Sequence, residues 1–165
     1  MADLTFTVDS ALLSELGEKL VESVHVALLE LVKNAYDADA TVVTVELVTT
    51  ASGSPEVTIS DDGTGMTFDE VEKYWMRIAT TNKVKNDASS VYGRPRTGSK
   101  GIGRFSCRRL GTKLVLETIA KNREGKLEKT EVTFPWDKFE AGSELITIKC
   151  PGSREYSPKA RLVQP

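Results

Sequence analysis

Residues 30–38, Glu-Leu-Val-Lys-Asn-Ala-Tyr-Asp-Ala, close a long segment of helical periodicity and decide the first layer of the fold. Between about Ser10 and Tyr36, apolar residues recur at three- and four-residue spacing, which predicts one helical face that packs on a core. A break at Gly17 would divide this segment into two helices. The apolar residues are Leu12, Leu16, Leu20, Val24, Leu28, Leu31 and Ala35.

A polar stripe lies beside this apolar face. Glu30, Asn34 and Asp37 occupy positions i, i+4 and i+7, so a helix brings them onto one side. Carboxylate and amide oxygens suit a hard cation such as Mg²⁺, and a free carboxylate can orient or deprotonate water. A solvated helix face produces the same pattern and, from spacing alone, is the more common explanation.

A hairpin and an acidic, glycine-rich turn follow the helix. Thr41 to Val48 and Glu56 to Ser60 are rich in β-branched residues and predict two paired strands. Residues 61–66, Asp-Asp-Gly-Thr-Gly-Met, come directly after the second strand. Glycine lets the backbone approach a ligand closely, and Asp61 at a strand end can accept from an adenine amine. A plain hairpin turn is an equally good explanation of an Asp-Gly pair.

A second glycine-rich segment, residues 98–104, reads Gly-Ser-Lys-Gly-Ile-Gly-Arg and precedes a predicted short helix from Arg104 to Leu110. Exposed amides at a helix start favour phosphate. The order of residues matches neither a P-loop nor a dinucleotide-binding fingerprint. The preceding residues 80–99 are polar and aperiodic, which predicts a lid-like loop. A flexible linker is the alternative for the glycine-rich segment.

The remaining elements predict an α+β fold, a mostly antiparallel sheet with helices on one face. Thr67 to Glu70 has the pattern of a capping box that opens a helix to about Ala79. Further strands are expected at residues 113–120, 127–134 and 145–149. We expect residues 1–150 to form the domain and residues 151–165 to be an irregular tail.

Composition excludes several other classes of protein. The 165 residues carry a formal net charge of -2, which argues against a generally nucleic-acid-binding surface. Neither a bilayer-spanning apolar run nor a secretory signal is evident, so no membrane partner is expected. The two cysteines, Cys107 and Cys150, lack metal-ligand spacing, and unpaired thiols favour a cytoplasmic location.

Together the three segments resemble the boxes of the GHKL ATPases: DNA gyrase B, heat-shock chaperones, sensor histidine kinases and MutL-type repair proteins. The similarity is strongest to stand-alone prokaryotic, MORC-like and MutL-like members. It covers residues 20–111 and implies a Bergerat-type two-layer sandwich with an ATP lid. A following transducer domain, expected from the family, would lie beyond this chain.

The resemblance also implies roles for individual residues. Glu30 would activate the attacking water, Asn34 would hold Mg²⁺, and Asp61 would recognise adenine. The remaining nucleotide contacts implied by the family are Asp37, Gly63, Gly65, Met66, Ile78, Lys83, Gly98, Lys100, Gly101, Ile102, Gly103, Arg104 and Ser143. Of these, Ser143 stands where the family often has a threonine beside the adenine carboxylate.

The function implied is Mg²⁺-dependent ATP binding with slow hydrolysis, used as a conformational switch. Two alternatives remain open: a histidine-kinase catalytic domain, and a nucleotide-gated interaction module without turnover. The family implies a nucleotide-dependent dimer of the full-length protein and an unidentified downstream domain or client. Nucleic acid would be bound only through regions outside this chain. ATP hydrolysis by the isolated chain is not required by this interpretation.

Overall fold

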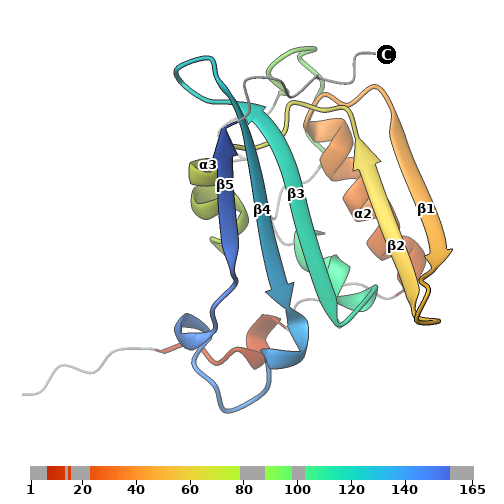
Figure 1. Cartoon of the computed structure of the whole chain (residues 1–165), viewed down its shortest axis with the longest axis vertical. Coiled ribbons are helices and arrows are strands. Elements are labelled where there is room, and N and C mark those ends of the chain that lie inside the picture. The colour runs from red at the N-terminus through yellow and green to blue at the C-terminus, as the bar shows by residue number, and fades with distance from the viewer. Residues whose placement is uncertain (1–6, 14, 16–22, 79–87, 98–102, 157–165) are drawn as a thin grey trace, which may run out of the picture.

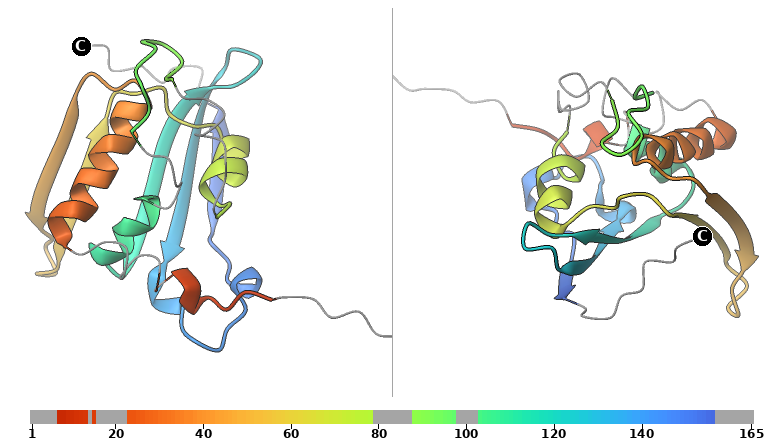
Figure 2. Two further views of the ribbon diagram at one scale, coloured as in Figure 1. Left: turned by 180° about the vertical axis from the view of Figure 1, so that it is seen from behind. Right: turned by 90° about the horizontal axis from the view of Figure 1, so that it is seen from above.

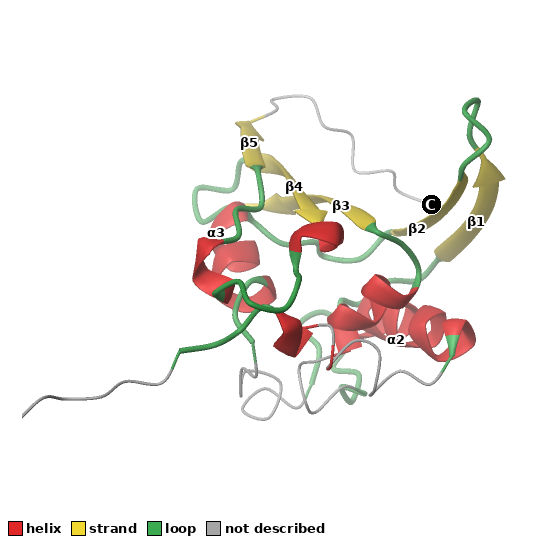
Figure 3. Ribbon diagram, turned by 90° about the horizontal axis from the view of Figure 1, so that it is seen from below, coloured by secondary structure: helices red, strands yellow, loops and turns green. Residues whose placement is uncertain are grey.

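The computed structural model of the chain describes residues 7–13, 15, 23–78, 88–97 and 103–156. Strands form one layer and helices cover one of its faces, as the turned views of the ribbon show (Figures 2 and 3). The predicted α+β class with helices on one face is therefore confirmed. The main elements are α2 (Val24–Asp37), β1 (Val43–Thr49), β2 (Pro55–Asp61), α3 (Phe68–Glu70), η2 (Gly103–Arg109), β3 (Lys113–Lys121), β4 (Leu127–Pro135) and β5 (Gly152–Tyr156).

The hairpin β1–β2 is antiparallel and pairs Val43 with Asp61 at one end and Thr49 with Pro55 at the other. Its turn contains Gly53 at φ 82°, in the left-handed region that glycine adopts without strain. The predicted hairpin is confirmed. The strands lie largely exposed, and Leu47 retains 75% of its accessible surface.

The second sheet has the order β3-β4-β5, with every pairing antiparallel (Figure 1). Two predictions fail here. Residues 152–156 are not irregular, because they pair with residues 128–132 of β4 as strand β5. The strand expected at residues 145–149 is instead a short 3-10 helix, Leu145–Thr147. Strand β5 was missed because a polar edge strand shows little hydrophobic pattern. Residues 145–149 are apolar enough to predict a strand, but they pack without strand pairing.

Strand β5 is tied to the helical layer through Arg154. Its guanidinium donates to the Asp69 carboxylate and lies 4.6 Å from the centroid of the Phe68 ring. The buried Glu128 carboxylate on β4 accepts from the Phe68 backbone amide at 2.7 Å. These contacts explain why an exposed strand has a fixed register.

Helix α2 begins at Val24, well after Ser10, where the predicted helical segment starts. Ser23 is extended, and its side chain accepts from Val26 N, so it caps a new helix at Val24. A new helix start at Val24 agrees with the prediction that the segment from Ser10 to Tyr36 is divided into two helices, and Gly17, where the break was expected, lies outside the described residues. The capping box of Thr67 and Glu70 is confirmed, although α3 continues after Glu70 as a π-helical turn, Val71–Trp75.

The apolar core lies between the helices and the β3–β5 sheet. Its buried members are Leu13, Val71, Phe105, Cys107, Val132, Phe134, Trp136 and Phe139. Helix η2 also packs closely on α2, where the fully buried Ser106 donates from its hydroxyl to the Ala27 carbonyl at 3.3 Å. Among the described helices, none combines the length and apolarity needed to cross a membrane.

Candidate nucleotide site

The C-terminal half of α2 presents the polar stripe that the sequence predicts. Asp37 is buried, whereas Glu30 and Asn34 are half-buried. The Glu30 carboxylate accepts from Lys33 Nζ at 2.9 Å, one turn along the same helix. The helix therefore offers oxygen ligands and one carboxylate that is paired with a partly exposed lysine.

The described residues on either side of 98–102 lie against this stripe: Thr97, just before the third box (residues 98–104), and Gly103 within that box. The backbone amide and hydroxyl of Thr97 donate to Asp37 Oδ1 at 2.8 and 3.0 Å. A Cβ built on Gly103 would lie 2.5 Å from Glu30 Oε2, so the backbone of Gly103 closely approaches the Glu30 carboxylate. Asp37 and Glu30 are two turns apart, roughly 10 Å along the helix axis. Gly98, Lys100, Gly101 and Ile102 lie outside the described residues.

The second box meets the end of the same helix. Thr64 N donates to the Ala38 carbonyl at 2.8 Å, and a Cβ on Gly63 would lie 2.7 Å from that oxygen. Asp61, at the end of β2, is exposed, and its Oδ1 accepts from Gly63 N at 2.9 Å. The described parts of the second and third box regions, far apart in sequence, thus lie against α2, the helix that carries the first box.

Gly65 and Met66 connect the second box to the β3 sheet. Gly65 has φ 65°, and a Cβ there would overlap the Ile119 carbonyl oxygen. Met66 N donates to Thr118 Oγ1 at 2.8 Å, and the half-buried Met66 side chain packs against the core. Glycine is required here for both the backbone conformation and the close approach to β3.

Comparison with known proteins agrees with this convergence. Residues 21–157 match the model of the family described as histidine kinase-, DNA gyrase B- and HSP90-like ATPase. The chain belongs to this family. This is the GHKL family that the three boxes resemble, and membership supports ATP binding.

Several curated proteins are similar to this GHKL chain. Chaperone protein HtpG of Bacteroides thetaiotaomicron is 30% identical over 88% of the chain and 24% of its own length. HtpG of Bacteroides fragilis strain 638R is 27% identical over 85% of the chain and 20% of its own length. A Herpetosiphon aurantiacus protein named "Putative type II restriction enzyme HgiDII" is 34% identical over 61% of the chain and 15% of its own length. The chain spans less than a quarter of the length of these relatives.

The two acids of the second box differ in what they contact. Asp62 accepts from the backbone amides of Thr41 and Val42 at 2.6 and 2.9 Å. These bonds, with the Thr41 hydroxyl bond as the largest cause, lower the pKa of Asp62 to about 2. Asp62 therefore fastens the end of β2 to the start of β1, which leaves Asp61 as the ligand-facing candidate of the GHKL box.

Arg104 is turned away from the α2 stripe. Its guanidinium donates to the Arg77 carbonyl and lies 5.0 Å from the Phe105 ring centroid. Burial lowers the pKa of Arg104 to about 10, so the group stays charged at neutral pH. Arg104 therefore holds the segment that follows the π-helical turn Val71–Trp75. Lys83, another predicted phosphate contact, lies outside the described residues.

Ser143 is placed away from the convergence of the boxes. Its carbonyl accepts from Ser10 N at 2.8 Å, beside the bridge between Asp9 and Glu144. Strand β4, which leads to this segment, ends at the opposite end of the layer from β2 (Figure 1). The structure therefore does not bring Ser143 to Asp61. The hydroxyl that contacts the second box is that of Thr118 on β3, which the sequence analysis missed because no motif marks it.

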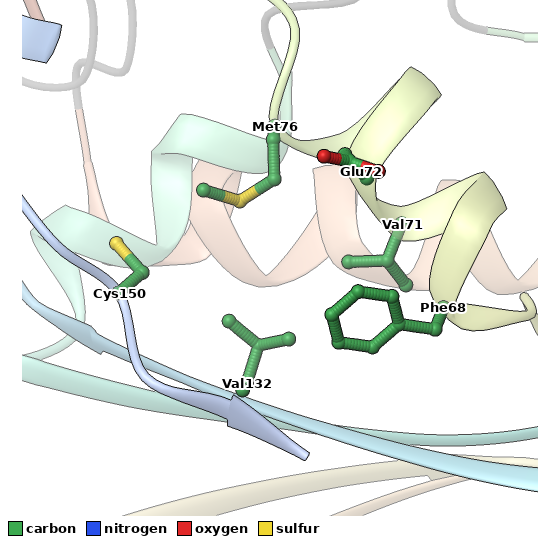
Figure 4. A pocket seen from close by; sticks show the side chains of 7 residues that line it. Phe68, Val71, Glu72, Met76, Val132 and Cys150 are labelled. Atoms are coloured by element: carbon green, nitrogen blue, oxygen red, sulfur yellow. The ribbon is translucent and has the colours of Figure 1, made fainter. Parts of the chain in front are cut away.

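Two cavities lie apart from the α2 stripe. The larger, about 660 Å³, has a mainly aromatic and aliphatic wall that includes Trp75, Phe105, Trp136 and the predicted nucleotide contact Ile78. The smaller, about 180 Å³, lies between α3 and β4, where Phe68 and Met76 face Val132 (Figure 4). Apolar walls do not compensate for the desolvation of a triphosphate, so neither cavity suits the phosphates of ATP.

The donor set of the stripe fits Mg²⁺. No cluster of three or more His, Cys, Asp or Glu side chains that could hold a metal occurs within the described ranges. Mg²⁺ commonly takes one or two protein oxygens and completes its shell with water and substrate phosphates. The Asn34 amide oxygen, with Glu30 one turn away, is compatible with that mode of binding.

Proposed function

We propose that this GHKL chain binds ATP with Mg²⁺ and hydrolyses it slowly, as a nucleotide-driven switch within a larger protein. The observation that carries the proposal is the convergence of the three boxes on one helix. Thr97 and Gly103 meet Asp37 and Glu30, and Thr64 meets Ala38. ATP would fit this arrangement, with its base at the Asp61 carboxylate and its phosphates near Glu30 and Gly103 on the third box side.

The residues divide the work as the chemistry of ATP requires. Asp61 would accept from the adenine amine, with Met66 packing on the base. The amides of residues 98–104 would hold the phosphates, and Asn34 would ligate Mg²⁺. Glu30 would orient and deprotonate water. Hydrolysis of this kind depends on positioning and charge stabilisation more than on covalent chemistry.

The partners follow from the proposal. In the complete protein, we expect ATP to favour a dimer and to signal to a downstream domain or client. A cytoplasmic location is proposed together with this role. The two HtpG relatives are named as chaperones, but the chain covers too little of their length for a client to be assigned.

Calorimetric titration of the chain with ATP, ADP and GTP tests the proposal. We expect Mg²⁺-dependent binding of ATP and at least tenfold weaker binding of GTP, because guanine presents a carbonyl where adenine presents an amine. Asp61→Asn should remove this preference. Glu46→Gln, an exposed β1 carboxylate with the same change of charge, is the matched control. Equal affinity of the wild-type chain for GTP and ATP would contradict the role of Asp61.

A further inference from the structure

Asp39 lies just beyond the end of α2 in an unusual backbone conformation. Its φ is 66°, and it is the one non-glycine residue with positive φ in the described part of the chain. Aspartate tolerates this region better than bulky residues do, although at some cost. The side chain is only 5% exposed. A strained and buried acid needs compensating contacts.

Those contacts come from residues 89–92, about fifty positions later in the chain. Asp39 Oδ1 accepts from Ser89 Oγ at 2.5 Å and from Tyr92 N at 3.1 Å. Its Oδ2 accepts from Val91 N at 2.8 Å. Burial alone would raise the pKa of Asp39, but these bonds and the nearby charge of Arg94 outweigh it and lower the pKa. The carboxylate is therefore ionised at neutral pH and accepts from these donors, with Ser90 Oγ a further one at 3.5 Å from Oδ2.

Arg94 provides a second attachment of the same loop. Its Nη1 donates to the Ala40 carbonyl at 2.6 Å. Its guanidinium lies 4.9 Å from the Tyr36 ring centroid and 4.7 Å from that of Tyr92, within cation–π range of both. The loop is also closed on itself, because Ser89 N donates to the Arg94 carbonyl and Arg94 N to Ser89 Oγ. Residues 88–97 thus form a compact unit fastened to the end of α2.

This unit ends immediately before the third box, residues 98–104. Thr97, its last residue, is the one whose amide and hydroxyl meet Asp37, and Gly103 beside Glu30 is only six residues later. We propose that Asp39 is a positioning residue for triphosphate binding, acting through the 88–97 loop to fix Thr97 against Asp37 on α2. The inference rests on the proposed function and adds a residue that touches no nucleotide.

The test compares Asp39→Gly and Arg94→Lys with the wild-type chain. Glycine keeps the positive φ and removes the carboxylate, so backbone strain does not confuse the result. Lysine keeps the positive charge but loses the planar group that stacks between the two tyrosines. Hydrogen exchange at Val91, Tyr92 and Thr97 reports the attachment directly, and we expect it to accelerate about tenfold or more in Asp39→Gly.

Ligand affinity separates positioning from general damage to the fold. Adenosine uses only the base site, whereas ATP also needs the third box. We expect ATP affinity to fall by about tenfold in Asp39→Gly, the loss typical of a charged hydrogen-bond partner, and adenosine affinity, measured by NMR titration, to stay unchanged. Arg94→Lys should change the same ratio in the same direction.

The outcomes distinguish the two proposals. Absence of ATP binding by the wild-type chain would overturn the proposed function, and the inference with it. If the wild-type chain binds ATP but both variants keep its ratio of ATP to adenosine affinity, Asp39 is not a positioning residue. An equal loss of both ligands, with a lower melting temperature, would show a purely structural role and would also overturn the inference.

Discussion

Two acidic regions border the convergence of the boxes, and they differ in what their carboxylates do. At the end of α2, Asp37 and Asp39 are both buried, and both accept from residues 89–97. At the end of β2, Asp61 and Asp62 are both exposed, and Asp62 accepts from the start of β1. Acids that look alike in sequence therefore divide into those that hold the site together and Asp61, for which we propose a ligand-facing role. Contacts from distant segments make the division.

Glu30 offers the largest test of this division, because it lies on the same helix as Asp37, and among the described residues its carboxylate accepts from a lysine one turn away. If it orients the attacking water, Glu30→Gln should lower ATP turnover by about 10² to 10⁴, the usual loss for a positioned base. ATP affinity should persist, since removal of a negative charge reduces repulsion of phosphate. Steady-state hydrolysis and equilibrium titration, both in the complete protein, measure the two effects.

Glu46→Gln is the matched control for this experiment, since it makes the same change on an exposed strand position. Turnover in the control should equal that of the wild type. Parental turnover in Glu30→Gln would show that this carboxylate is not the base. The kinase and non-hydrolysing alternatives would then gain weight.

Gly65 tests whether the turn after Asp61 needs its contact with β3. Gly65→Ala combines a left-handed backbone with overlap of the Ile119 carbonyl, whereas Gly53→Ala has a similar φ but no atom within 4 Å. The control should cost about 1–2 kcal/mol of unfolding free energy from φ alone. Overpacking should add roughly 1–3 kcal/mol for Gly65→Ala. Urea denaturation of both variants measures the difference, and equal losses would mean that the contact is unimportant.

The sequence predicts what depends on local pattern. The β1–β2 hairpin follows from two β-branched runs with a glycine turn, and the capping box of Thr67 and Glu70 from four adjacent residues. Strand β5 could not be predicted in this way. Its sequence, Gly-Ser-Arg-Glu-Tyr, has no apolar alternation, and its register depends on pairing with β4 and on Arg154.

The candidate site shows the same limit. The motif pattern selects Glu30, Asn34 and Asp61 without any coordinates, because their spacing is fixed within single segments. Asp39 and Thr118 could not be selected, since each is defined by partners fifty or more residues away. The positive φ of Asp39 could be inferred from sequence only if a related protein had glycine at the same position.

The smallest expected effect separates Asp61 from Asp62. Asp62→Asn should lower the urea midpoint at pH 7, because the carboxylate accepts from two backbone amides and a hydroxyl, whereas Asp61→Asn should leave it nearly unchanged. The pKa of Asp62 falls from 3.8 to about 2 on folding, so its contribution is complete above pH 3.8 and is lost as pH falls through about 2. Urea titrations between pH 7 and pH 2 should therefore show the wild type converging on Asp62→Asn as the solution becomes acidic. Asp61→Asn should instead follow the wild type throughout. If the two variants lose the same stability at pH 7, the division of the two acids into structural and ligand-facing roles is wrong, and Asp61 is a structural residue as well.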